Sequence, residues 1–148
     1  MSKASVALDA ILNSIVAVDK PMPDVVRVAL KRDLAKTHAG ASTDEYEALF
    51  PDGPLEKAEL RFVRERETGM LILRTRASEP VHERDLDLTK RGRMGGPAVN
   101  PHIPPEGTQA YTCTMSKTRT VTFTFTMQSR LLMHVVFDWI KEPPPPAK

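Results

Sequence analysis

Cysteine is nearly absent from this sequence, and several other features that would assign a protein class are missing. The single Cys113 excludes an internal disulfide framework and is typical of a reducing compartment or an assembled particle. No apolar run approaches the roughly 18 residues that a membrane-spanning helix needs. The N-terminus lacks the basic and apolar regions of a signal peptide, so we expect a cytoplasmic or particle-associated protein that no signal peptide exports.

An excess of charge of one sign is missing too. The 21 basic and 19 acidic residues leave a formal net charge of +2, which argues against a strongly basic nucleic-acid binder but allows a local patch. His38, His82, His102 and His134 are scattered, with neither HxxxH nor CxxC spacing beside them. The sequence therefore predicts no metal site and no cofactor.

Proline, in contrast, is abundant, with 13 residues in a chain of 148. The prolines concentrate in residues 90–108 and in a tail at 143–148, which indicates extended segments rather than general disorder. The chain length fits one domain with a core. We predict a single α+β domain over residues 1–142, with helices in 3–50 and a sheet in 56–140 that includes an extended arm at 90–108.

The most regular stretch is KTRTVTFTFTM, residues 117–127. Val121, Phe123 and Phe125 alternate with threonines, a pattern that predicts a half-buried strand with one apolar face and one hydroxyl face. Because a single strand is not stable alone, neighbouring segments must pair with it, and amphipathic helices must cover its phenylalanines.

Helices are predicted near the N-terminus. Residues 3–18 carry apolar side chains at helical spacing, and residues 23–38 combine a proline start with cations near the end. Ser42 followed by Glu45 is a capping-box pattern and predicts a short helix over 44–49.

A period of two begins after residue 55 and predicts the sheet. Strands are expected over 56–65, 70–77 and 109–116, with a weaker edge strand over 81–89. Residues 131–140 fit a strand or an apolar helix, and their β-branched content favours the strand. The predicted fold class is α+β, with two or three N-terminal helices packed on an antiparallel sheet of five to six strands.

Our first functional hypothesis is a non-enzymatic structural subunit that forms a homo-oligomer, such as a component of a phage or virus particle. Proline-rich segments lose less entropy on ordering than flexible ones, so they suit arms that lie along a neighbouring subunit. An unordered loop is the equally weighted alternative. The residues predicted at oligomer contacts are Pro97, Pro101, His102, Pro104, Pro105, Pro143 and Pro144.

The alternative is a module that binds RNA or DNA, because threonine hydroxyls and basic side chains contact phosphates. Acidic residues in the same region favour cross-strand ion pairs instead, and threonine is also simply a good strand former. The residues predicted for nucleic-acid binding are Arg64, Arg66, Arg74, Arg76, Lys90, Arg91, Arg93, Lys117, Arg119, Thr120, Thr122 and Thr124.

Enzymatic chemistry has little support in the sequence. Cys113 and His134 form a conceivable nucleophile pair, but a buried cysteine that acts as a small apolar residue is the simpler interpretation. Glu83, Asp85 and Asp87 are predicted on one strand face, where charge protects a sheet edge. We therefore predict no catalytic residues, no small-molecule substrate and no contact with a membrane.

Overall fold

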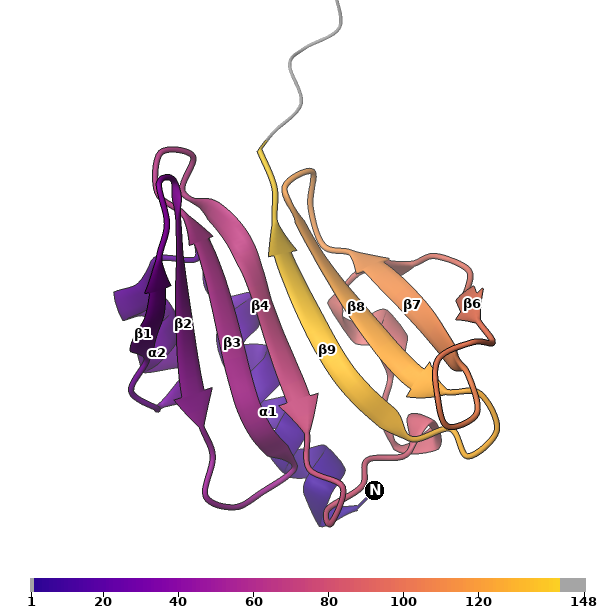
Figure 1. Ribbon diagram of the computed structural model, residues 1–148. Coiled ribbons are helices and arrows are strands. Elements are labelled where there is room, and N and C mark those ends of the chain that lie inside the picture. The colour runs from indigo at the N-terminus through magenta and orange to yellow at the C-terminus, as the bar shows by residue number, and fades with distance from the viewer. Residues whose placement is uncertain (1, 142–148) are drawn as a thin grey trace, which may run out of the picture.

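A single antiparallel sheet dominates the computed structural model, which describes residues 2–141. The strand order is β1-β2-β3-β4-β9-β8-β7-β5, and β6 pairs with β7 next to β5. Both helices lie behind the sheet in the view of Figure 1. The elements are α1 Lys3–Val16, α2 Pro23–Leu30, β1 Ala35–Ala39, β2 Thr43–Leu49, β3 Leu55–Val63, β4 Thr68–Thr75, η1 Glu83–Asp85, η2 Leu88–Arg91, β5 Arg93–Met94, β6 Ala98–Asn100, β7 Thr108–Thr114, β8 Arg119–Thr126 and β9 Leu132–Trp139.

The predicted fold class is wrong. Residues 2–141 form nine strands instead of five or six, and they contain only two short α-helices. The predicted second helix stops at Leu30 because Lys31 adopts a left-handed conformation with φ of 56°. Residues 35–38 of that predicted helix belong to β1 instead.

The predicted short helix over 44–49 is also wrong, since this segment is the strand β2. Its neighbours decide the conformation: β2 pairs with β1 on one side and with β3 on the other. Asp44 is buried on the helix-covered face, where Arg64 binds its carboxylate at 2.6 Å. Long-range pairing therefore overrides the local capping pattern.

The predicted edge strand over 81–89 is wrong as well. Only His82 makes an isolated bridge, to Leu131, and the two 3-10 turns η1 and η2 follow it. The Asp87 carboxylate accepts hydrogen bonds from the backbone N–H of Thr89 (3.0 Å) and from its hydroxyl (2.6 Å). This local turn competes with a strand, and Glu83, Asp85 and Asp87 consequently share no strand face.

Two other predictions about the sheet are confirmed. The threonine-rich stretch forms β8, with Val121, Phe123 and Phe125 fully buried. Residues 131–140 are strand rather than helix, and β9 lies between β8 and β4. A fully buried phenylalanine stabilises the fold by about 1.5–3 kcal/mol, so this face of the sheet carries the core.

The two helices pack on that core face. Leu8, Leu12 and Ile15 of α1 and Val26 of α2 are almost completely buried. Trp139 donates a hydrogen bond from Nε1 to the carbonyl oxygen of Val18 (3.0 Å), just beyond the end of α1. No helix within residues 2–141 is long and apolar enough to cross a membrane.

Candidate binding face of the sheet

The sheet face opposite the helices is uncovered by any helix within residues 2–141, and we call it the open face (Figure 1). The strand register divides it into three zones. The charged zone consists of Glu45, Glu47, Lys57, Glu59, Arg61 and Arg74. The apolar strip consists of Met70, Ile72 and Val136, and the threonine zone of Thr112, Thr114, Thr120, Thr122 and Thr124.

Ion pairs between neighbouring strands compensate the charged zone. Lys57 lies 3.1 Å from Glu47 and 3.6 Å from Glu59, which also accepts a hydrogen bond from Arg74 at 2.8 Å. The hydrogen bond from Arg74 lowers the pKa of Glu59, and the hydrogen bond to Glu47 raises the pKa of Lys57. Both side chains therefore stay charged and matched, so this zone has little excess charge with which to attract a polyanion.

The apolar strip runs through the middle of the open face on β4 and β9. Ile72 and Val136 are register partners and lie between the glutamates of β2–β3 and the threonines of β7–β8. Asp138 follows on the same face of β9, and burial raises the pKa of its carboxyl group. The centre of the open face is thus the part that water solvates least well.

The threonine zone brings together the three threonines that the sequence singled out. Thr120, Thr122 and Thr124 lie on the open face, opposite the buried phenylalanines, as the alternation predicted. Thr122 shares a hydrogen bond of 2.9 Å with Thr112 of β7. Hydroxyl groups that bond to one another in this way are less available to a phosphate.

The basic residues predicted to bind nucleic acid do not gather on one surface. Arg64 binds Asp44 and the carbonyl oxygen of Gly40 (2.9 Å), so it fixes the β1–β2 turn. Arg76 donates to the carbonyl oxygens of Gly53 (3.1 Å) and Leu55 (3.2 Å). These two guanidinium groups serve the loops around them.

Three further basic residues bind α1 and the residues just after it, two from η2 and one from β8. Lys90 (2.6 Å) and Arg91 both bind the Asp9 carboxylate of α1, and the side chain of Arg91 is only 4% exposed. Arg119 donates to the carbonyl oxygens of Val16 (2.7 Å) and Val18 (3.1 Å), where a cation also complements the helix dipole. Within residues 2–141, Arg66, Arg93 and Lys117 are the predicted cations without an ion pair or side-chain hydrogen bond.

The predicted arm at 90–108 contains two short strands rather than a structureless loop, because β5 and β6 pair with β7. Its far end is anchored by Glu106, whose Oε1 accepts hydrogen bonds from the backbone N–H groups of Gln128 (2.8 Å) and Ser129 (2.7 Å). The predicted oligomer contacts in the arm are all exposed, whereas Pro143 and Pro144 lie outside the described residues. The exposed residues are Pro97, Pro101, His102, Pro104 and Pro105.

Between the arm and the open face lies a hollow of about 310 Å³, which we call the arm hollow. Ala98, Ala110, Thr124 and His134 form one cross-strand row over β6, β7, β8 and β9. The side chains of Ala98, Ala110 and Thr124 are small, so the surface is hollowed above them, and His134 lies at the end of the row nearest the centre of the sheet. The remaining lining residues are Val99, Asn100, Ile103, Thr108 and Met133.

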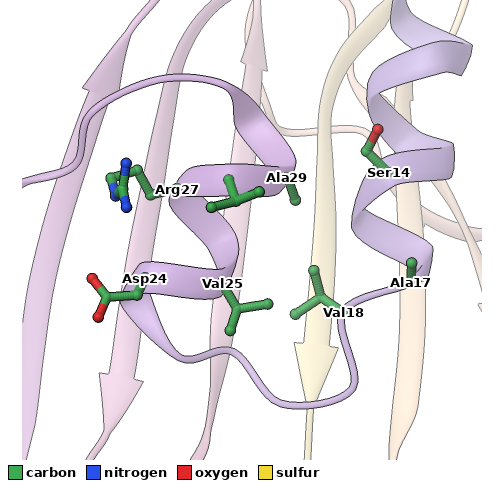
Figure 2. Close-up of a pocket in the computed structure, with 8 residues that line it drawn as sticks. Ser14, Ala17, Val18, Asp24, Val25, Arg27 and Ala29 are labelled. Atoms are coloured by element: carbon green, nitrogen blue, oxygen red, sulfur yellow. The ribbon is translucent and has the colours of Figure 1, made fainter.

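A second hollow, of about 540 Å³, lies between α1 and α2 on the other side of the molecule, and we call it the helix groove. In Figure 2, Val18, Val25 and Ala29 point into the gap between the helices, whereas Asp24 and Arg27 lie on the far side of α2. Val25 and Val28 are 46% and 66% exposed. The helix groove is apolar, and its two charged residues point away from it.

The conceivable nucleophile pair does not form. Cys113 lies on the helix-covered face, where its thiol donates a hydrogen bond to the carbonyl oxygen of Leu88 (2.9 Å) and burial raises its pKa. His134 lies on the open face, on the other side of the sheet. Within residues 2–141, no three His, Cys, Asp or Glu side chains are arranged to hold a metal ion.

Sequence reasoning missed both hollows. The arm hollow depends on Ala98 and Ala110 being register partners, and their positions in the sequence do not reveal that pairing. Comparisons with known protein families, curated proteins and solved structures gave no match to this chain.

Proposed function

We propose that this protein is a non-enzymatic assembly subunit that forms a homo-oligomer through its open face and its arm, as a repeating particle requires. The observation that carries the proposal is the uncovered sheet face, with an apolar strip at its centre and compensated charges and hydroxyls around it. Such a layout, apolar in the middle and polar at the rim, is typical of protein interfaces. Antiparallel sheets often leave one face to water, so the apolar strip, rather than the open face alone, argues for a partner.

The sheet edges are poorer candidates than the face. The β1 edge carries Lys36 and a register irregularity between Lys36 and His38, and lysines and bulges both discourage strand addition. At the other edge, β5 and β6 have only two and three residues. We therefore infer contact between faces rather than continuation of the sheet from one subunit to the next.

The dimensions of the open face suit a stable contact. Its six central strands, about 4.8 Å apart and each about 20 Å long, span a patch of about 25 by 20 Å. A standard interface buries about 800 Å² on each partner, and a patch of this size with side-chain relief is of that order. Ile103, an exposed apolar side chain of the arm, lies beside it in the arm hollow.

Light scattering coupled to size exclusion tests the proposal on the full chain between about 10 µM and 1 mM, where interfaces of moderate affinity form. We expect a dimer or a larger species, and we expect Val136→Asp to give a monomer because it places a charge in the apolar strip. Val28→Asp is the control, since it makes the same substitution at an exposed valine of the helix groove.

A wild-type protein that stays monomeric at the highest concentration would overturn the proposal. If Val28→Asp dissociates the oligomer and Val136→Asp does not, the contact lies at the helix groove and the assignment to the open face is wrong.

A further inference from the structure

We propose that the arm hollow binds a small uncharged organic molecule with an apolar ring or short chain and one hydroxyl or amide group. The lining of the hollow belongs to one chain alone. The proposed assembly would bring a second subunit close to Thr124 and the arm, but this inference does not depend on that assembly. Its volume of about 310 Å³ is at the lower end of the roughly 300–1,000 Å³ of small-molecule sites.

Two threonines supply the first evidence for a ligand. Thr108 and Thr124 both line the hollow, and each is only 8% exposed. Within residues 2–141, neither hydroxyl has a hydrogen-bond partner, whereas Thr126, the register partner of Thr108, binds Ser129 (2.7 Å) and the N–H of Leu131 (2.9 Å). Neither hydroxyl oxygen is itself sealed from solvent, and both residues line the hollow, so the two hydroxyls are available to a partner that enters it.

His134 supplies a third polar group. Burial lowers its pKa, and the charge of Arg74 on the neighbouring strand lowers it further. The imidazole is therefore neutral near pH 7 and presents one donor and one acceptor nitrogen. An alcohol or an amide, which also donates and accepts, matches this histidine and the two threonine hydroxyls.

The ligand is inferred to be uncharged because no charged side chain lines the hollow. The nearest cation across the strands is Arg74, which Glu59 already binds at 2.8 Å. A charged group in the hollow would lose water without gaining a counter-ion, which is unfavourable. The rest of the lining is apolar and suits a ring or a short alkyl chain: Ala98, Val99, Ile103, Ala110 and Met133.

The arm holds the wall of the hollow in place. The N–H of Gly107 donates to the carbonyl oxygen of Ile103 (2.7 Å), and Glu106 anchors the next turn to Ser129. The pairing of β6 with β7 holds the other end of the wall. The hollow therefore exists before a ligand arrives, which lowers the entropy lost on binding.

Phenol is the probe, with benzoate as its charged counterpart, and NMR chemical shifts of the full chain are the readout. We expect phenol to shift the signals of Ala98, Ala110, Thr108 and Thr124 with a Kd on the order of 1 mM, as befits so small a molecule. Benzoate should bind at least about tenfold more weakly, because its charge would be unpaired. Repeating the titration in Val136→Asp separates this site from any effect of self-association.

Two variants test the geometry. Ala110→Leu fills the floor and should weaken phenol binding at least about tenfold, whereas Thr114→Leu, on the same strand and face but outside the hollow, should leave it unchanged. Thr124→Val removes one hydroxyl at nearly constant shape and should weaken binding about three- to tenfold, the value of one hydrogen bond. If Ala110→Leu fails to fold, Thr124→Val still tests whether phenol binds in the arm hollow.

Three outcomes would overturn the inference. These are phenol shifts confined to the helix groove of Figure 2, equal affinity in Ala110→Leu and Thr114→Leu, and benzoate binding as tight as phenol binding. A monomeric wild type that still binds phenol in the hollow would refute only the assembly proposal.

Discussion

The ion pairs of Asp9 allow a sharp test of how burial sets the value of a charge. The Asp9 carboxylate of α1 binds two cations, Lys90 at 2.6 Å and Arg91. Their environments differ, since the side chain of Lys90 is 46% exposed and that of Arg91 only 4%. Removing Asp9 therefore leaves one exposed cation, which water solvates, and one buried cation, which water does not reach.

The expected magnitudes follow from this difference. Breaking a buried ion pair from one side costs about 3–5 kcal/mol, whereas an exposed pair contributes about 0–1 kcal/mol. After Asp9 is removed, Asn13 can still accept a hydrogen bond from Arg91 at 3.1 Å, which favours a cost at the lower end of the range of about 3–5 kcal/mol. We expect Asp9→Ala to lower the free energy of unfolding by about 3 kcal/mol and Lys90→Ala by at most about 1 kcal/mol.

Urea denaturation followed by circular dichroism measures both variants, and thermal denaturation should show a decrease in Tm of about 10 °C for Asp9→Ala. An unchanged m value would show that the variant still unfolds in one step from the same native state. Equal losses for the two variants, both below about 1 kcal/mol, would refute the reasoning from burial.

The stability that the Asp9 ion pairs contribute should decrease in acid. Burial alone would raise the pKa of Asp9, but the hydrogen bonds from Lys90 and Arg91 lower it below its usual 3.8. The stabilisation is therefore fully present above pH 3.8 and is lost as the pH falls through the lower pKa of the folded state. Asp9→Ala should lose less stability than the wild type over that acid range.

Two further predictions concern the arm. Gly107 has φ of +87°, and a Cβ there would lie 2.7 Å from Met127 Sδ and 2.9 Å from Pro101 Cα. Gly107→Ala should therefore lower the free energy of unfolding, measured by urea denaturation, by about 1–3 kcal/mol. Gly96→Ala is the control and should leave it unchanged, because a Cβ at Gly96 would meet open space. Hydrogen bonds from Ser129 lower the pKa of Glu106, so the anchor of the arm should hold above pH 4.5 and weaken as the pH falls through the lowered pKa. The protection factor of the Ser129 amide, which corrects for the intrinsic slowing of exchange in acid, should then fall with the pH, and a Glu106→Gln variant that shows the same acid response would contradict this.

Strongly periodic segments of the sequence predicted their structure well. Val121, Phe123 and Phe125 alternate with threonines, and a period of two leaves no competing way to bury them together. The helix over residues 3–18 was predicted from its apolar stripe and is observed as α1 at Lys3–Val16. These signals are local, so they do not depend on the rest of the fold.

The predictions failed where a local signal competed with long-range pairing. Ser42 and Glu45 fit a capping box, yet residues 43–49 form β2 because they pair with β1 on one side and with β3 on the other. The basic residues were expected to act together on one surface. Arg64 and Arg119 instead bind backbone carbonyl oxygens of distant segments, and those partners are unknown until the chain has folded.

The alternation in residues 117–127 was enough to give β8 one apolar and one hydroxyl face, because successive side chains of a strand point to opposite sides. What lies opposite each residue could be known only from the folded chain: Arg91 meets Asp9, Cys113 and His134 lie on different faces, and the small side chains of β6, β7 and β8 fall in one row. Strand order and register arise from the packing of the whole sheet, and a difference of one residue would reverse every face.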